Sequence, residues 1–211
     1  MKKFELTNEF VTNMFGTKLF RIRALVEFGD VEAGELGGYV EKESNLGHDD
    51  NAWVYDNAWV YGNARVYGDA LVYDNARVYG NAWVYGDAQV SGDALVYGNA
   101  RVYGNAWVYG NAQVSGDARV CGDARVCGNG DYAYAHGFGS VNRTTTFFRL
   151  KDGGVGVRCG CFYGTLAQFR DKIRETHGET KKAQEYLMLA DLMELRFEED
   201  ENEVGNRKYV E

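Results

Sequence analysis

The sequence predicts a mainly β protein built as a parallel β-solenoid, and a six-residue repeat is the main observation behind this. The unit Asn/Asp-Ala-x-Val-Tyr-Gly recurs without insertion from Asn51 to Gly128. An unbroken short period is typical of solenoids, in which each repeat buries its apolar face only against its neighbours. The second observation is that the 211 residues contain no proline, which suits a chain whose backbone donors enter strand ladders.

Each unit of the repeat contains one strand and one corner. Six is an even number, so the alternation of side chains along a strand stays in phase from one repeat to the next. The alanine and the valine therefore point to one side, and the tyrosine and the residue before the valine point to the other. Glycine followed by Asn or Asp favours a turn, because these residues tolerate a positive φ. Three units of six residues then close a triangular coil of eighteen residues.

This repeat resembles the hexapeptide repeat of left-handed parallel β-helix proteins. The motif Val-x-Gly-Asn/Asp-Ala-x covers roughly a third of the chain, with thirteen valines in register. The resemblance implies a left-handed parallel β-helix, and the handedness rests on the resemblance because parallel crossovers are otherwise right-handed. One departure is the tyrosine that mostly follows the valine, where the family has a small or acidic residue.

Two regions are expected up to the end of the rod. Residues 1–34 should form an N-terminal β cap, in which residues 19–25 alternate like a strand. Residues 35–137 should form the hexapeptide-repeat β-helix, with residues 35–46 as a degenerate first coil. An atypical first coil is expected because an open solenoid end must be protected against edge pairing.

A third region, residues 138–211, should form a C-terminal α+β domain made of a β-hairpin and two helices. The hairpin strands are expected at residues 144–150 and 155–161. Thr165 and Gln168 have the spacing of a capping box at the start of the first helix. That helix should stop near Gly178, and the second should begin near Thr180.

Short segments of these flanks resemble uncharacterised proteins encoded in phages and prophages. They are residues 36–41, residues 145–148 and residues 159–178. The resemblance implies a viral accessory role, with counter-defence as its purpose, and it carries over no catalytic residue.

Composition limits the partners and the compartment. The net charge of −8 argues against a long nucleic-acid partner. We expect no signal peptide, no membrane span and no membrane partner. The four cysteines show no disulfide framework, so we expect a cytoplasmic protein, in the host cytoplasm if it is phage-encoded.

Stacking at eighteen residues turns each outward position into a column. The first column has no charge before its last coil and presents Trp53, Leu71 and Trp107. A flat apolar face is rarely left in water, so we expect a homo-oligomer that contacts through this face. Trimers are the common state in the family that the repeat resembles. The alternative is that the tyrosines beside this column only rigidify the rod.

Another column combines arginines with tyrosines and is the predicted ligand site. Arg65, Arg101 and Arg119 would pair with phosphates, while Tyr85 and Tyr103 would stack on an aromatic ring. The expected ligand is a small, anionic, nucleotide-like molecule. The alternative is a solvated arginine column balanced by the corner residues Asp69, Asp87 and Asp123.

Catalysis finds little support in the sequence. Hexapeptide-repeat acyltransferases use a histidine base, and His136 is the weak candidate here. Neither His48 nor His177 lies in a regular repeat, so we expect no three-histidine metal site and no cofactor. We therefore expect a non-catalytic binding protein of phage type, which engages a host factor or sequesters a ligand. An acyltransferase is the alternative, and a purely structural or assembly role is the third option.

Overall fold

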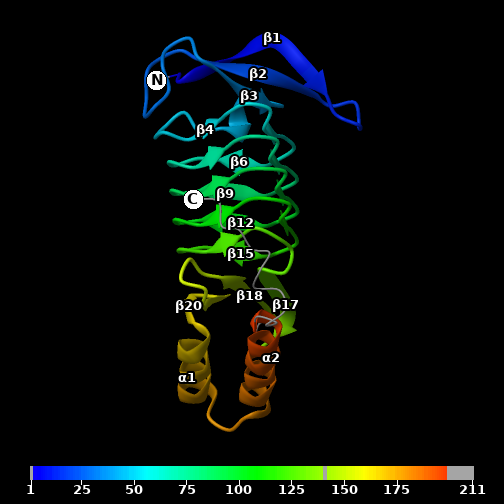
Figure 1. The fold of residues 1–211 in the computed structure, drawn as a ribbon. Coiled ribbons are helices and arrows are strands. Elements are labelled where there is room, and N and C mark those ends of the chain that lie inside the picture. Colours follow the sequence, from blue (N-terminus) through cyan, green and yellow to red (C-terminus); the bar gives the residue numbers. More distant parts are fainter. Residues whose placement is uncertain (1, 140–141, 199–211) are drawn as a thin grey trace.

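The computed structural model describes residues 2–139 and 142–198, and it shows a rod with a different cap at each end (Figure 1). The N-terminal strands lie at one end, the solenoid forms the middle and two helices lie at the other end. The protein is mainly β and its centre is a β-solenoid, as the sequence predicts. Residues 199–211, the end of the predicted C-terminal domain, lie outside the described residues.

The strands of the solenoid stack in parallel into three faces. The first face contains β4 (Trp53–Val54), β7 (Leu71–Val72), β10 (Gln89–Val90), β13 (Trp107–Val108) and β16 (Arg125–Val126). The second contains β5 (Trp59–Val60), β8 (Arg77–Val78), β11 (Leu95–Val96) and β14 (Gln113–Val114). The third contains β6 (Arg65–Val66), β9 (Trp83–Tyr85), β12 (Arg101–Tyr103) and β15 (Arg119–Val120). Each residue pairs with the one eighteen positions later, which confirms the predicted columns.

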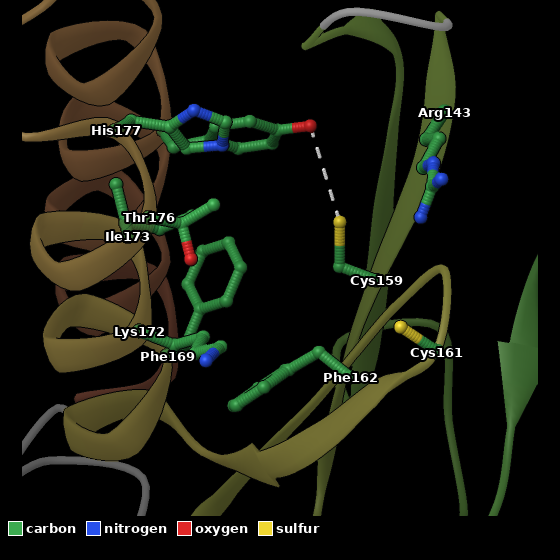
Figure 2. Close-up of a pocket in the computed structure, with 10 residues that line it drawn as sticks. Arg143, Cys159, Cys161, Phe162, Phe169, Lys172, Ile173, Thr176 and His177 are labelled. Atoms are coloured by element: carbon green, nitrogen blue, oxygen red, sulfur yellow. Dashed lines mark hydrogen bonds between the residues drawn. The ribbon is translucent and has the colours of Figure 1, made fainter.

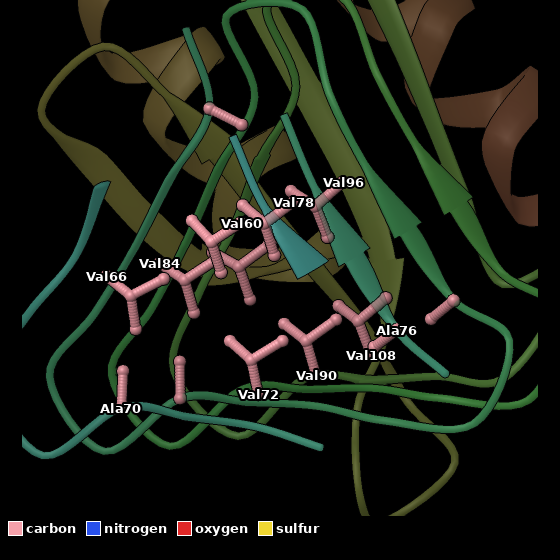
Figure 3. Close-up of a cluster of buried hydrophobic side chains, with 14 of the residues drawn as sticks. Val60, Val66, Ala70, Val72, Ala76, Val78, Val84, Val90, Val96 and Val108 are labelled. Atoms are coloured by element: carbon pink, nitrogen blue, oxygen red, sulfur yellow. The ribbon is translucent and has the colours of Figure 1, made fainter. Parts of the chain in front are cut away.

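The alanine and the valine of every repeat fill the interior of the rod (Figure 3). Both side chains are fully buried in every repeat, from Ala52 and Val54 to Ala124 and Val126. Protein interiors pack at the density of organic crystals, so a core of two small side chains per strand fixes the coil diameter.

Glycines turn most corners because the coils approach one another closely there. Gly68 has a φ of +73°, and a Cβ at this position would lie 2.9 Å from the backbone nitrogen of Gly86 in the next coil. Three corners instead carry aspartates with positive φ, Asp50 at 59°, Asp56 at 51° and Asp74 at 58°. Aspartate tolerates this conformation better than most residues, which explains why it can replace Gly at these corners.

The N-terminal cap continues the second face. β1 (Phe4–Thr12), β2 (Lys18–Ala24) and β3 (Leu36–Val40) form an antiparallel extension, and β3 pairs in parallel with β5. After a 3-10 turn at Glu43–Asn45, Leu46 forms a bridge with Val66 on the third face. The expected degenerate first coil is therefore present.

Two buried polar side chains close the solenoid edge on the other faces. The Lys3 ammonium donates to the carbonyls of Asp50 and Ala52, at 3.2 and 2.8 Å. The Asn45 amide donates to the carbonyls of Gly62 and Ala64, at 3.1 and 2.8 Å. Each side chain donates hydrogen bonds to carbonyls at the end of the solenoid, where no further coil supplies backbone donors.

The opposite end is covered by a four-stranded antiparallel sheet. Its strands in order are β17 (Tyr132–Phe138), β18 (Arg143–Arg149), β19 (Val155–Cys159) and β20 (Phe162–Thr165). The predicted hairpin forms its two central strands, β18 and β19. The strand that the sequence assigned to the end of the rod, β17, is instead an edge strand of this sheet. The Tyr132 hydroxyl donates to the Gln113 carbonyl at 2.5 Å and so ties the sheet to the last coil.

Two helices pack against this sheet. α1 (Leu166–His177) starts at the Thr165 and Gln168 capping box, and α2 (Lys181–Phe197) starts after Thr180, as predicted. The helices and the sheet share a second core, separate from that of the solenoid. No helix in the described residues is long and apolar enough to cross a membrane.

Candidate ligand-binding site

The third face brings the predicted arginine column together around one tryptophan. The pairing runs from Arg65 through Trp83 and Arg101 to Arg119. The guanidinium carbons of Arg65 and Arg101 lie 5.8 and 4.9 Å from the centre of the Trp83 ring, one on each neighbouring strand. These are cation–π contacts, and they hold the two charged groups at the surface of the face.

The arginine side chains remain available for a ligand. Across residues 2–139 and 142–198, none of Arg65, Arg101 and Arg119 forms an ion pair with a carboxylate. The corner aspartates therefore do not neutralise this column by direct contact, which was the alternative that the sequence left open. A guanidinium whose N–H donors do not pair with a carboxylate can donate two parallel hydrogen bonds to an anionic ligand.

The tyrosines beside the arginines form a continuous stack. The ring centres of Tyr67 and Tyr85 are 5.0 Å apart with an angle of 1° between the ring planes. Those of Tyr85 and Tyr103 are 4.9 Å apart with an angle of 2°. Tyr85 thus has a tyrosine ring on both sides, and Tyr103 ends the stack against Cys121, with which it shares a hydrogen bond. The predicted stacking of a ligand on Tyr85 or Tyr103 is therefore wrong in its geometry, because their ring faces are turned to their neighbours.

The free end of this stack is a hollow next to the first coil. Gly47 lies above Tyr67 in the column, since Leu46 pairs with Val66, and glycine brings no side chain to cover the ring. A Cβ added at Gly47 would lie 3.1 Å from the Tyr67 Cβ. The hollow has a volume of about 380 Å³, and its walls are Ser44, Leu46, Gly47, Arg65, Val66, Tyr67 and Trp83.

A smaller hollow of about 140 Å³ adjoins the first one and adds a second cation. The two hollows share Ser44 and Arg65, and the smaller one is also lined by Lys42 and Asn63. We call the two hollows together, with Lys42, Ser44, Arg65, Tyr67 and Trp83 around them, the column-end site. Arg65 and Ser44 line both hollows, while Tyr67 and Trp83 line only the larger one and Lys42 only the smaller one.

Burial sets the charge state of the tyrosines. Desolvation raises the pKa of Tyr67, Tyr85 and Tyr103 above the ordinary phenol value, although nearby arginines act in the opposite direction on all three. The phenols therefore stay neutral at physiological pH, and they add no negative charge that would repel an anion.

Sequence reasoning identified Arg65 and the column but missed Lys42, Ser44, Tyr67 and Trp83. The usable signal was the N-terminal end of the tyrosine column, where Gly47 stands in place of an aromatic residue. Finding it from the sequence requires the register of the first coil, which is two residues longer than the others because Leu46 pairs with Val66.

The first face differs from its prediction at one position. Trp53 is fully buried, because Phe4 and Phe28 of the N-terminal cap pack on its ring with centroids 6.2 and 5.3 Å away. Trp53 is therefore wrong as an exposed interface residue. Leu71 and Trp107 are partly exposed, and their role in oligomer contact stays a prediction.

The remaining candidate groups lie apart from the column-end site. His136 is exposed on β17, where its Nδ1 is 2.8 Å from the Thr144 hydroxyl. No group of three or more His, Cys, Asp or Glu residues in the described part could hold a metal ion.

The solenoid matches one known family of repeats. The family model described as YdcK beta solenoid repeat matches residues 58–72, 70–86, 88–101, 96–110, 100–116 and 112–128. The chain is thus a β-solenoid repeat protein by sequence similarity as well as by structure. No curated protein sequence is similar enough to this chain to count as a relative.

Proposed function

We propose that this chain is a non-catalytic binding protein that holds a small anionic, aromatic ligand at the column-end site. The observation that carries the proposal is that Arg65 lines both adjoining hollows, beside Tyr67 in the larger one and beside Lys42 in the smaller one. An aromatic ring placed there extends the tyrosine stack by one member, and its anionic group lies within reach of two cations.

The charge distribution favours a small ligand over a long one. The net charge of −8 repels a polyanion at a distance, while an arginine and a lysine attract a compact anion locally. A nucleotide has both required parts, an aromatic base and a phosphate.

The second face is a natural comparison because it contains the same parts without a hollow. Arg77 lies 4.6 Å from the Trp59 ring, and Tyr61, Tyr79 and Tyr97 form a similar stack. On the second face, the cap strand β3 pairs with β5 and so lies beyond Tyr61 at the end of the stack. Glu41 directly follows β3, and its carboxylate accepts a hydrogen bond from the Gly62 amide. The end of that stack is covered by chain and faces a negative charge.

Calorimetry of the full chain against mono-, di- and cyclic nucleotides tests the proposal. One class should bind, and salt should weaken the binding because phosphate is neutralised by exposed cations. Arg65→Ala should reduce the affinity about tenfold or more, since a hydrogen bond to a charged group contributes about 1.5–3 kcal/mol. Arg101→Ala should also weaken binding, because Arg101 holds Trp83 from the other side.

Arg77→Ala is the matched control, since it removes the same kind of arginine–tryptophan contact from the second face. Its affinity should equal that of the wild type. Absence of heat with every nucleotide, or equal losses in Arg65→Ala and Arg77→Ala, would leave the column as solvated surface and would favour a protein partner.

The biological setting is part of the same proposal. The repeat supports a left-handed winding and membership of the hexapeptide-repeat proteins, and the flanks support a phage accessory protein of the host cytoplasm. The purpose would be counter-defence, by sequestering a nucleotide-like signal or by binding a host factor. The scaffold would be a trimer that contacts through Leu71 and Trp107.

The alternative of a hexapeptide-repeat acyltransferase requires His136 as the base. Its Nδ1 is paired with the hydroxyl of Thr144, whereas a histidine base is commonly oriented by a carboxylate. The binding role is therefore preferred.

A further inference from the structure

A second pocket lies at the far end of the molecule, between the C-terminal sheet and the helix pair, and it is independent of the column-end site. Figure 2 shows α1 on one side of this pocket and Cys159 with Arg143 on the other. Its volume is about 270 Å³. This volume is slightly below the usual range for ligand pockets, so its occupant must be a small molecule.

The floor of the pocket is apolar and aromatic. Phe169 of α1 lies 5.6 Å from Phe162 of β20 and 5.8 Å from Tyr186 of α2, measured between ring centres. Ile173 completes this floor, one turn further along α1. Three secondary-structure elements thus converge on a surface suited to a flat or branched apolar group.

The rim is cationic. Arg143, Lys172 and His177 line the pocket, and no carboxylate is among the lining residues. The Arg143 guanidinium forms no ion pair within the described residues. Lys172 contacts Glu175 at 2.8 Å, but both side chains are more than half exposed, so water screens this pair and it competes weakly with a ligand. A cluster of basic groups without acids is unexpected in a chain of net charge −8.

A thiol forms part of the wall. The Cys159 sulfur accepts a hydrogen bond from the Thr145 hydroxyl at 3.2 Å, and the thiol donates to the Tyr186 hydroxyl at 4.0 Å. Burial is the main cause that raises the pKa of Tyr186 to about 12, and the neighbouring Cys159 thiol is the second cause. The phenol is therefore neutral, and no negative group from this wall opposes an anion.

We propose that this pocket binds a small organic anion with an aromatic or branched body. The body would lie on Phe162, Phe169 and Ile173, and the anionic group would pair with Arg143 and Lys172. The shared chemistry is a single anionic head group on a compact apolar body, which carboxylates and phosphate monoesters both provide.

Amide NMR spectra of the full chain test the proposal with three probes: phenylacetate, phenyl phosphate and phenylacetamide. Phenylacetate, phenyl phosphate or both should give saturable shifts in β19 and α1, and comparing the two anions identifies the preferred head group. Phenylacetamide has the same body without the charge, and it should bind about tenfold more weakly or worse. Alkylation of Cys159 by iodoacetamide should slow in the presence of the bound anion and not with the amide.

Arg143→Gln should weaken binding of the anion about tenfold and leave phenylacetamide unaffected. Arg143 is exposed, so the variant should fold. Arg174→Gln is the control, because Arg174 lies on the same helix as Lys172 but pairs with Asp171 at 3.2 Å and does not line the pocket. Equal binding of acid and amide, equal losses in Arg143→Gln and Arg174→Gln, or no saturable shift with either anion would overturn the proposal.

Discussion

Replacement of Asn45 by alanine should destabilise the protein far more than the same replacement elsewhere in the repeat. Asn45 is 1% exposed, and its amide satisfies the carbonyls of Gly62 and Ala64 at the open edge of the third face. Its Oδ1 also accepts from the Lys42 amide at 3.0 Å. Asn45→Ala removes all three hydrogen bonds and leaves no side chain that could replace them.

The size of the effect follows from the exposure of the orphaned groups. An unsatisfied buried acceptor costs about 1–3 kcal/mol, and the Gly62 carbonyl is only partly buried, so we expect a loss of about 2–4 kcal/mol in the free energy of unfolding. With a urea m-value of about 2 kcal/mol/M, the unfolding midpoint should fall by roughly 1–2 M.

Asn81→Ala provides the matched control. Asn81 belongs to the ladder of exposed corner amides, where it accepts from Asn63 at 3.2 Å and donates to Asn99 at 3.1 Å. Water replaces these bonds, so the change should stay within about 0.5 kcal/mol. Urea unfolding of the two variants, followed by circular dichroism and tryptophan fluorescence, should separate them. Equal midpoints would refute the view that Asn45 closes the solenoid edge.

Three further predictions concern other parts of the molecule. Burial lowers the pKa of Lys3 to about 8, so above pH 8, and before the thiols and phenols ionise, Lys3 binds more protons in the unfolded chain than in the folded one. The free energy of unfolding should therefore rise with pH in this window, and denaturant titrations should show that the slope is lost in Lys3→Met. Trp107→Glu should dissociate the proposed trimer in sedimentation equilibrium, and a monomeric wild type would contradict the predicted contact. His136→Ala should leave ligand binding and biological activity unchanged, whereas a folded variant without activity would favour the transferase.

The repeat predicts the rod because the information for it is local. The inward direction of an alanine and a valine follows from a period of six, and burial of Ala76 and Val78 needs nothing beyond the neighbouring coils. The same holds for the capping boxes of the helices, since Thr165 and Gln168 lie three residues apart.

Features that join distant segments could not be predicted in this way. Trp53 has the sequence context of any outward residue, and only the cap residues Phe4 and Phe28 decide that it is buried. Similarly, residues 132–138 continue the alternation of the rod, but pairing with β18 places them in another sheet. In both cases a long-range contact overrides a local pattern that was correctly identified.

The same distinction explains where a rod of this kind can hold a ligand. Within the regular coils each outward side chain has a neighbour one coil away, as Tyr85 has Tyr67 and Tyr103, so these neighbours cover the surfaces that a ligand would use. A surface becomes free only where a column ends or changes residue type. Gly47 creates such an end above Tyr67, and the second pocket lies outside the solenoid, between the C-terminal sheet and the helix pair. Specific binding in a highly repetitive protein should therefore be sought at departures from the repeat, and neither proposed site lies within the regular coils.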